Sequence, residues 1–190
     1  MKTGLFFGSF NPVHIGHLVI ANYMANYTEL DEVWMVVSPH NPLKNKKGLS
    51  NSYDRLEMVR LATENSLQLK VSDIEFTLSQ PSYTIDTLIH LEEKYPTRAF
   101  ALIMGADNLA SFKKWKNYEV ILKNYKLYVY PRPGVNVEEW KNHPAVVLTD
   151  TPQMDISSTF IRNAVKEKKN IQYFVPDKVI TFIEGKNMYR

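Results

Sequence analysis

The sequence predicts an α/β fold in which a doubly wound parallel sheet lies between two layers of helices, with residues 1–190 forming a single domain. Three observations predict it. Strand-like apolar runs alternate with helix-like patterns, the strand runs are apolar at nearly every position, and 190 residues suffice for one domain with a full core. Alternation favours parallel pairing with helices on both faces, and continuous apolar strands are typical of strands buried on both sides.

In the first part of the chain, strand and helix signals alternate twice. Residues 5–7 form the first expected strand, and a helix follows over about 16–27, where apolar residues recur at the spacing of one helix face. The apolar run 33–37 is the second strand. A polar loop broken by prolines then leads to Ser52, which can cap a helix reaching about residue 64.

The middle of the chain continues the pattern. A short strand is expected at about 69–71, and Thr84 can cap a helix that reaches about Tyr95, where Pro96 stops it. The run 99–104 is almost entirely apolar and indicates a buried strand. In sheets of this kind ligands bind beyond the carboxyl ends of the strands, so the loops that follow strands are where functional residues are expected.

The last part of the chain supplies two more strands and two helices. The run 127–130 is a strand that ends at the proline- and glycine-rich turn 131–134, and 146–148 is the last strand. A helix beginning near Ser157 opens a C-terminal helical portion of the domain. A final helix is expected over about 176–184, with a glycine directly after it as its stop.

The composition is that of an ordinary soluble globular protein, with 44% hydrophobic residues, 23% charged residues and a net charge of +3. The basic residues are mixed with acids, which disfavours a nucleic-acid partner and suits a small anionic ligand. The chain has no cysteine, which excludes thiol catalysis, disulfides and thiolate metal sites. We expect a cytoplasmic protein without a membrane partner, because no run approaches the roughly 20 apolar residues that span a bilayer. The oligomeric state stays open, and a homo-oligomer is compatible with the sequence.

The loop after the first expected strand reads G-S-F-N-P-V-H-I-G-H from Gly8 to His17. It carries neither the dinucleotide-binding glycine fingerprint nor a P-loop. His14 and His17 are three residues apart at a helix start, so they share one face, and the helix N-terminus adds a partial positive charge. Gly16 leaves backbone room for a bulky anion. These features predict a phosphate site built from histidines and backbone N–H groups.

Two other interpretations of this loop are open. The histidines can be structural residues beside the tight turn at Asn11–Pro12. They can also ligate zinc, although no third ligand lies near them in the sequence.

A second candidate segment reads I-S-S-T-F-I-R from Ile156 to Arg162. Ser157, Ser158 and Thr159 present hydroxyls and unpaired N–H groups at an expected helix start. Arg162 lies one turn further and can bind two oxygens of a phosphate at once. The alternative is an ordinary serine-capped helix with a surface arginine. Together with the histidine loop, the segment favours a triphosphate cradle.

The Gly8–Leu18 segment resembles the N-terminal motif of the adenylyltransferases with the H-x-G-H signature. This group includes the nicotinate (or nicotinamide) mononucleotide and phosphopantetheine adenylyltransferases and is distantly similar to class I aminoacyl-tRNA synthetases. Residues 156–162 resemble its second signature, I-S-S-T-x-I-R. The resemblance implies a Rossmann-like, three-layer αβα form of the predicted fold.

Four further segments resemble the bacterial nicotinate mononucleotide adenylyltransferases in particular. They are S-P-H-N-P-L-K at 38–44, P-S-Y-T-I-D-T-L at 81–88, G-A-D-N-L at 105–109 and F-K-K-W at 112–115. The resemblance therefore covers nearly the whole chain, from about Gly4 to Arg162. It implies transfer of the adenylyl group of ATP to nicotinate mononucleotide, which forms deamido-NAD and pyrophosphate in NAD biosynthesis.

Physical chemistry gives the acceptor segments plausible roles. A flat pyridinium ring is expected to pack on an aromatic face such as Trp115. The N–H groups of Thr84 and Ile85, at a helix start, suit the nicotinate carboxylate. Asp107 can accept hydrogen bonds from ribose hydroxyls. Each role has a structural alternative, in which Trp115 belongs to the core, Tyr83 only packs and the lysines of residues 44–47 form a solvated loop.

These considerations give three sets of candidate residues. The candidate catalytic residues are His14, His17 and Arg162. The candidate ATP-binding residues are Gly8, Ser9, Phe10, His14, Gly16, His17, Gly105, Asp107, Ser157, Ser158, Thr159 and Arg162. The candidate acceptor-binding residues are Asn11, Lys44, Tyr83, Thr84, Ile85, Asp107, Trp115 and Arg132, with Lys44 and Arg132 expected to meet phosphates.

The predicted mechanism is in-line attack of the acceptor's 5′-phosphate on the α-phosphorus of ATP. A phosphate is already ionised at neutral pH, so we expect neither a nucleophilic side chain nor a general base. His14 and His17 are expected to bind α- and β-phosphate oxygens, and Ser157, Ser158 and Arg162 the β- and γ-phosphates. Mg²⁺ is expected as a cofactor held chiefly by the ATP phosphates and water, with no protein residue assigned as a metal ligand.

Three alternatives stay open. The same chemistry can act on nicotinamide mononucleotide or phosphopantetheine, and the residues leave open how strictly acid is preferred to amide. A non-catalytic nucleotide-binding module can share the fold. A synthetase-like tRNA partner is disfavoured, because the length leaves no anticodon domain and no basic face stands out.

Overall fold

The structure is a computed structural model that describes residues 1–39, 48–80 and 82–190. The strands are β1 (Lys2–Gly8), β2 (Glu32–Val37), β3 (Leu69–Ser72), β4 (Ala99–Gly105), β5 (Lys126–Tyr130) and β6 (Val146–Leu148). The α-helices are α1 (Ile15–Tyr27), α2 (Ser52–Thr63), α3 (Thr84–Lys94), α4 (Ala106–Ala110), α5 (Tyr118–Asn124), α6 (Ser158–Lys166) and α7 (Asp177–Gly185). Short 3₁₀ helices are η1 (Ile74–Phe76), η2 (Phe112–Lys114) and η3 (Glu138–Trp140).

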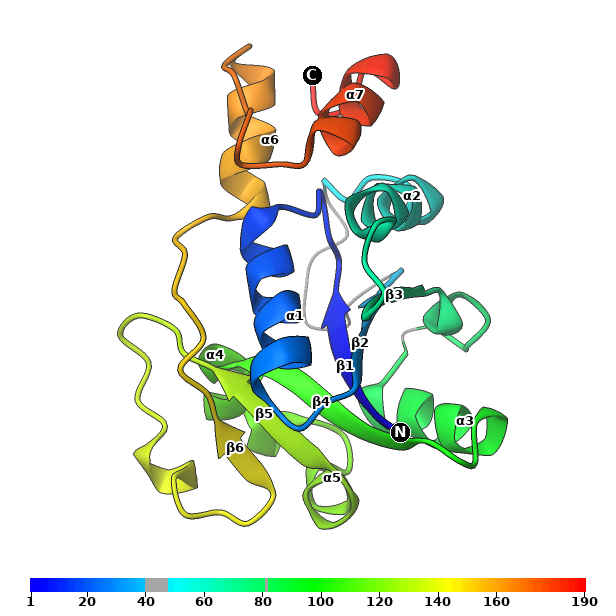
Figure 1. Ribbon diagram of the computed structural model, residues 1–190, viewed down its shortest axis with the longest axis vertical. Coiled ribbons are helices and arrows are strands. Elements are labelled where there is room, and N and C mark those ends of the chain that lie inside the picture. The colour runs from blue at the N-terminus through cyan, green and yellow to red at the C-terminus, as the bar shows by residue number, and fades with distance from the viewer. Residues whose placement is uncertain (40–47, 81) are drawn as a thin grey trace.

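The strands form one sheet in the order β3-β2-β1-β4-β5-β6, and each neighbouring pair is parallel (Figure 1). Leu5 of β1 lies opposite Trp34 of β2 on one side and Leu102 of β4 on the other. The chain order reverses between β1 and β4, so the carboxyl ends of these two strands flank the switch point at which doubly wound sheets bind ligands. The predicted α/β class with a doubly wound parallel sheet is confirmed.

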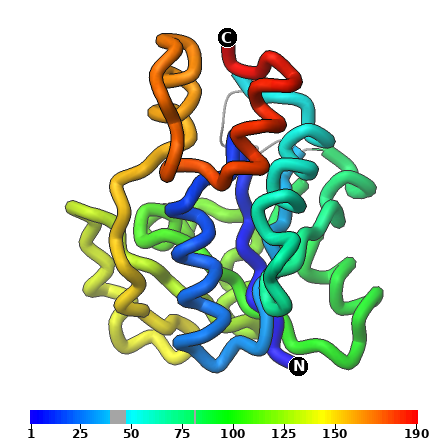
Figure 2. Tube along the Cα trace, turned by 45° about the horizontal axis from the view of Figure 1, so that its top comes forward, coloured from blue at the N-terminus to red at the C-terminus, as the bar shows by residue number. Residues whose placement is uncertain are grey.

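Helices cover both faces of the sheet, and each face has its own apolar core. On one face, Met24 of α1, Val59 of α2, Ile161 of α6 and Val179 of α7 belong to one buried cluster. On the other, residues of α3, α4 and α5 form a second cluster around Leu102. The C-terminal helices thus share the core of the N-terminal half. Figures 1 and 2 show the C-terminus beside α7, at the end of the molecule opposite the N-terminus.

The sequence located the longer elements well. The expected helices starting at about residues 16, 52, 84, 157 and 176 are observed with boundaries shifted by at most one residue. The short helices α4 and α5 and the 3₁₀ turns were not predicted. They span only three to seven residues each, which is too short for a 3.6-residue period to show.

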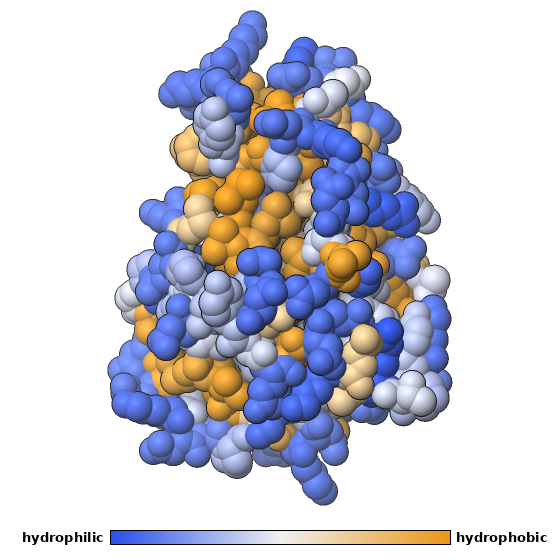
Figure 3. Space-filling model, viewed as in Figure 1, coloured by the Kyte–Doolittle hydropathy of each residue, from blue (hydrophilic) through white to orange (hydrophobic). Residues whose placement is uncertain are grey.

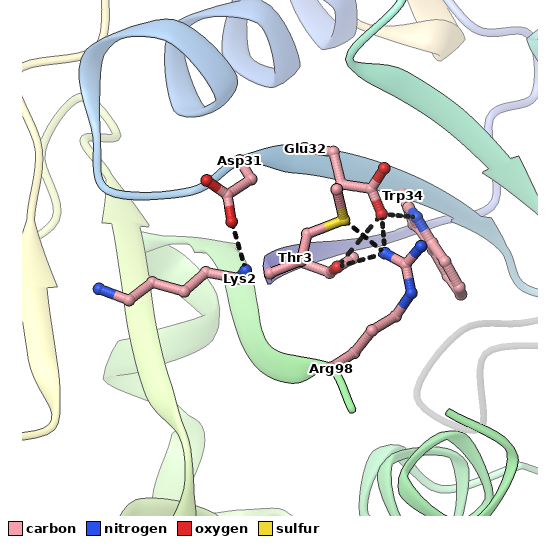
Figure 4. Close-up of polar contacts among 7 residues, drawn as sticks. Lys2, Thr3, Asp31, Glu32, Trp34 and Arg98 are labelled. Carbon is pink, nitrogen blue, oxygen red and sulfur yellow. Dashed lines mark hydrogen bonds and ion pairs between the residues drawn. The ribbon is translucent and has the colours of Figure 1, made fainter. Parts of the chain in front are cut away.

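A buried polar cluster fixes the amino ends of the central strands (Figure 4). The Glu32 carboxylate accepts hydrogen bonds from the Thr3 hydroxyl at 3.2 Å and the Trp34 indole at 2.7 Å, and it pairs with the Arg98 guanidinium. Arg98 also lies over the Trp34 ring, 5.1 Å from the centroid. Because ligands are expected at the opposite, carboxyl ends of the strands, this cluster has a structural role.

Apolar side chains also reach the surface. Figure 3 shows them gathered over α1 and the start of α6, where Phe160 is half exposed and packs against Phe174 with 5.1 Å between ring centroids. In the part of the chain that the structure describes, no helix is long and apolar enough to cross a bilayer.

Candidate active site

A cavity of ≈ 620 Å³ lies beyond the carboxyl ends of β1, β4 and β5. Its walls combine segments far apart in the chain: the loop after β1, the starts of α1 and α4, the turn after β5, and residues 151–162. His17 and Arg162, from the two sequence motifs, both line it. The fold therefore brings the two motifs together at one site, as the sequence predicted.

Two stacked imidazoles form one wall of this cavity. The His14 and His17 rings are 3.7 Å apart between centroids, and the His14 backbone N–H donates to His17 Nδ1 at 3.3 Å. An Nδ1 that accepts a hydrogen bond leaves Nε2 as the protonated nitrogen of a neutral ring. A Cβ at Gly16 would lie 3.1 Å from the His14 ring, so the room beside this glycine serves the stacked histidines.

His14 is held as a neutral imidazole. It is 5% exposed, and burial lowers its pKa to about 4, with a smaller contribution from the positive charge of Arg132. Its Nδ1 has no hydrogen-bond partner among the described residues. Buried polar atoms are usually hydrogen-bonded, so this Nδ1, which lines the cavity, is available to a ligand or a water molecule.

The second motif is tied directly to the turn that precedes the histidines. The Ser158 hydroxyl donates to the Pro12 carbonyl at 2.8 Å, and Arg162 Nη1 donates to the Asn11 carbonyl at 2.9 Å. Ser157 is the N-cap of α6 and accepts from the Phe160 N–H at 3.2 Å. Residues about 150 positions apart thus have a fixed relative geometry across the cavity.

The Asn11 side chain faces the protein as well as the cavity. Its Nδ2 donates to the Gly48 carbonyl at 2.9 Å, and its Oδ1 accepts from the Ser50 N–H at 3.2 Å and the Tyr189 hydroxyl at 2.9 Å. Asn11 therefore links the loop after β1 to the entrance of α2 and to the C-terminal residues.

Opposite charges meet on the other side of the cavity. Arg132 Nε lies 3.5 Å from Asp107 Oδ1, and both side chains are about half exposed. A Cβ at Gly105 would lie 2.3 Å from the same Asp107 oxygen, so only glycine fits at the end of β4 with Asp107 in this orientation. Because exposed ion pairs contribute little stability, a ligand can separate this pair at low cost.

A second cavity of ≈ 370 Å³ adjoins the first and shares Phe7, Ser38 and Asn108 with it. It is lined on one side by Trp115, whose Nε1 is buried without a hydrogen-bond partner among the described residues. On another side it is lined by Thr84, the first residue of α3. The N–H groups of a helix's first turn have no carbonyl within the helix to donate to, so they suit an anionic group.

Charged side chains surround the second cavity. Lys114 and Lys116 line it, and Lys116 lies over the Tyr83 ring, 4.6 Å from the centroid. Glu75 also lines it and is 3% exposed. Burial raises the pKa of the Glu75 carboxyl, and hydrogen bonding by the Ser38 and Thr87 hydroxyls opposes that rise. One of them, the Thr87 hydroxyl, donates to Glu75 Oε1 at 3.0 Å.

The candidate residues divide between the two cavities. The first is lined by the candidate ATP-binding residues Gly8, Ser9, Phe10, His14, Gly16, His17, Asp107, Ser157, Ser158, Thr159 and Arg162, together with Asn11 and Arg132 of the acceptor set. The second is lined by Tyr83, Thr84 and Trp115. Gly105 leaves the space that the Asp107 side chain occupies at the wall of the first cavity. The Ile85 side chain is buried in the core, and Lys44 lies outside the described residues.

Several lining residues were not among the candidates, namely Ser38, Glu75, Asn108, Lys114 and Lys116. A carboxylate between two apolar residues, as in Ile74-Glu75-Phe76, is the only signal in the sequence that could have pointed to Glu75. Ser38 follows a strand, which is where ligand-contacting residues are expected in this fold.

Comparison with known proteins gives a consistent result. Residues 5–164 match the family model described as cytidylyltransferase-like. Two curated relatives, from Flavobacterium johnsoniae and Flavobacterium psychrophilum, are 56% and 55% identical over the full length of both chains. Each carries the name "Probable nicotinate-nucleotide adenylyltransferase".

Solved structures show the same fold. The nicotinic acid mononucleotide adenylyltransferase of Plasmodium falciparum, complexed with NaAD, superposes with a TM-score of 0.82 over 99% of this chain and 97% of that chain. A second structure of that protein, complexed with APC, also gives 0.82. The identities are 20% and 21%, so these likenesses speak for the fold alone.

Proposed function

Since the chain belongs to the cytidylyltransferase-like family and, within it, to the nicotinate-nucleotide adenylyltransferases, we propose that it joins ATP to nicotinate mononucleotide and releases pyrophosphate. The product, nicotinate adenine dinucleotide, is the deamido form of NAD, so the reaction belongs to NAD biosynthesis. The observation that carries the proposal is the adjoining pair of cavities, which can hold two substrates at the switch point of the sheet. The reaction is expected to take place in the cytoplasm.

The chemistry is a single in-line displacement. An oxygen of the acceptor's 5′-phosphate forms a bond to the α-phosphorus of ATP, and the bond from that phosphorus to the α,β-bridging oxygen breaks. Pyrophosphate takes the electron pair with it. The attacking phosphate is ionised at neutral pH and needs no general base, so the protein has to align two polyanions and stabilise the charge of the transition state.

The first cavity supplies groups for that task. The His14 and His17 imidazoles can each donate an N–H to a phosphate oxygen. Arg162, at the start of α6, offers a guanidinium that can bind two oxygens. In the protein alone Arg162 donates to the Asn11 carbonyl, which holds it at the cavity wall until the nucleotide arrives. Ser157 and Ser158 add hydroxyls at the positive end of α6.

Magnesium fits this site as an ion that arrives with the nucleotide. The carboxylates of Asp107 and Asp155 line the first cavity, and Asp107 is already engaged by Arg132. In the residues that the structure describes, no three His, Cys, Asp or Glu side chains gather into a metal-holding cluster. We expect the triphosphate and water to be the main ligands, and the bound ion to offset the phosphate charge.

The second cavity suits the acceptor's pyridine ring. Trp115 offers an aromatic face for a cationic ring, and the first turn of α3 directs the N–H groups of Thr84 and Ile85 to an anion. Lys114 adds positive charge nearby, and Lys116 does so while paired with Asp86 at 3.0 Å. A carboxylate benefits from all of these groups, whereas the amide of nicotinamide loses the charge contribution. The cavity thus favours the acid over the amide.

An acceptor competition assay tests the proposal. The purified protein is given ATP, Mg²⁺ and one of three acceptors, and pyrophosphate release is followed. We expect kcat/KM for nicotinate mononucleotide to exceed that for nicotinamide mononucleotide by about tenfold or more, as for loss of a charged hydrogen bond, and phosphopantetheine to be inactive. The proposal is contradicted if no acceptor gives pyrophosphate release. It is also contradicted if the protein prefers nicotinamide mononucleotide or phosphopantetheine to nicotinate mononucleotide.

A further inference from the structure

Arg55 of α2 is a buried cation that donates hydrogen bonds to four backbone carbonyls. It is 1% exposed. Nη1 donates to the carbonyls of Ser9 at 2.6 Å and Ser38 at 2.8 Å, Nη2 to that of Pro39 at 3.0 Å, and Nε to that of Ser50 at 3.1 Å. One guanidinium therefore joins the loop after β1, the loop after β2 and the segment that enters α2.

Within the described ranges, the Arg55 guanidinium donates its hydrogen bonds to backbone carbonyls, and the nearby Tyr189 hydroxyl adds a favourable electrostatic contribution. Among the described residues no carboxylate lies within ion-pair distance of its guanidinium, in contrast to the exposed Arg60 on the same helix, which approaches Glu57 at 3.7 Å. Burial lowers the pKa of Arg55, because a desolvated cation is costly. An apolar residue would avoid that cost, so the position of the guanidinium beside these carbonyls requires an explanation.

Arg55 lies directly behind the walls of both cavities. Ser9 and Ser38 line the first cavity, and Ser38 also lines the second. In a trans peptide the carbonyl and the following N–H point in opposite directions. Since the Ser9 carbonyl is turned to Arg55, the N–H of Phe10 is turned away from it.

The same contact supports an unusual backbone conformation. Phe10 has φ 45°, in the left-handed region that a bulky residue adopts only when its surroundings hold it there. In this conformation its ring packs edge-on against His17, with 5.0 Å between centroids. The guanidinium is thus connected to a cavity-lining histidine through the Ser9 carbonyl and the Phe10 ring.

We propose that Arg55 is a positioning residue for adenylyl transfer, which holds the loops after β1 and β2 so that both cavities are formed before the substrates bind. The inference rests on the proposed function. Arg55 touches neither substrate, and its effect reaches the reaction through Ser9, Phe10 and Ser38. Loss of its hydrogen bonds should therefore affect catalysis in protein that is still folded.

The test compares Arg55→Lys and Arg55→Gln with the matched variants Arg60→Lys and Arg60→Gln. A lysine keeps the charge, but its single ammonium cannot span four carbonyls in three segments. Thermal unfolding first establishes a temperature at which each variant is folded. Pyrophosphate release is then measured there with ATP and nicotinate mononucleotide varied separately, which gives kcat and both KM values.

We expect both Arg55 variants to lose about tenfold or more in kcat, with lysine giving no rescue, while the Arg60 variants stay within about twofold of wild type. A folded Arg55→Lys or Arg55→Gln protein with wild-type kcat and KM values would overturn the proposal, and so would full rescue by lysine. If the wild type itself releases no pyrophosphate with this acceptor, the proposed function fails instead.

A measurement on the wild type covers the case in which both Arg55 variants unfold. Backbone ¹⁵N relaxation of the ligand-free protein reports the order of Ser9 and Phe10 on the ps–ns timescale. We expect order parameters of about 0.85, as in the strands. Values below about 0.6 would show that the guanidinium does not hold this loop, and would overturn the proposal.

Discussion

The neutral state of His14 predicts a specific dependence of stability on pH. Its pKa is about 4 in the folded protein and 6.5 in the unfolded chain. Between these values the unfolded chain binds the proton and the folded protein does not, so the free energy of unfolding falls as pH falls. This contribution is fully present above pH 6.5 and is lost progressively toward pH 4.

The magnitude follows from the size of the shift. One pKa unit corresponds to about 1.4 kcal/mol, so the whole effect is about 3 kcal/mol, and about 2 kcal/mol of it is lost between pH 7 and pH 5. Carboxylates also titrate in this range. The quantity to measure is therefore the difference in pH dependence between the wild type and His14→Gln, with His90→Gln as the control on α3.

Urea unfolding at pH 7 and pH 5 gives this difference, in buffers free of phosphate and sulfate, which would bind the site. We expect the wild type and His90→Gln to lose about 2 kcal/mol more than His14→Gln over this interval. An equal loss in all three proteins, or an NMR titration that gives His14 a midpoint near 6.5, would refute the reasoning.

Three further predictions concern other parts of the molecule. His17→Ala should lower kcat by about 10²–10³-fold and leave the thermal midpoint nearly unchanged, whereas a near-normal kcat would remove His17 from the mechanism. Trp115→Ala should raise KM for the acceptor about tenfold with little change in KM for ATP, and an equal rise in both would place the ring elsewhere. Glu32→Gln should lower the free energy of unfolding by about 2 kcal/mol in urea titrations, because the substitution leaves the Arg98 guanidinium without its carboxylate partner. It should leave kcat unchanged, because this pair lies far from both cavities. A variant as stable as the wild type would contradict this.

The sequence predicted those features that depend on short, contiguous patterns. The strands are apolar at successive positions, so their burial on both faces could be inferred without a structure. The histidine loop and the Ser157–Arg162 segment each follow a strand or begin a helix, and the fold rule for ligand sites then places them near one another. Their common cavity confirms this placement.

Features that depend on contacts between distant segments could not be predicted. Arg55 carries a charge that is seldom fully buried, and only the three segments that fold around its guanidinium explain its burial. Tyr189 is the penultimate residue, and nothing local indicates that its hydroxyl reaches Asn11. Glu75 is buried because hydroxyls of neighbouring segments satisfy it.

The most direct test of the account is a crystal structure of the protein with nicotinate mononucleotide, Mg²⁺ and an ATP analogue that cannot transfer its adenylyl group. We predict that the triphosphate lies between His17 and Arg162 in the larger cavity and that the pyridine ring lies against Trp115 in the smaller one. A triphosphate bound elsewhere, or contacting only one of the two motifs, would contradict the account.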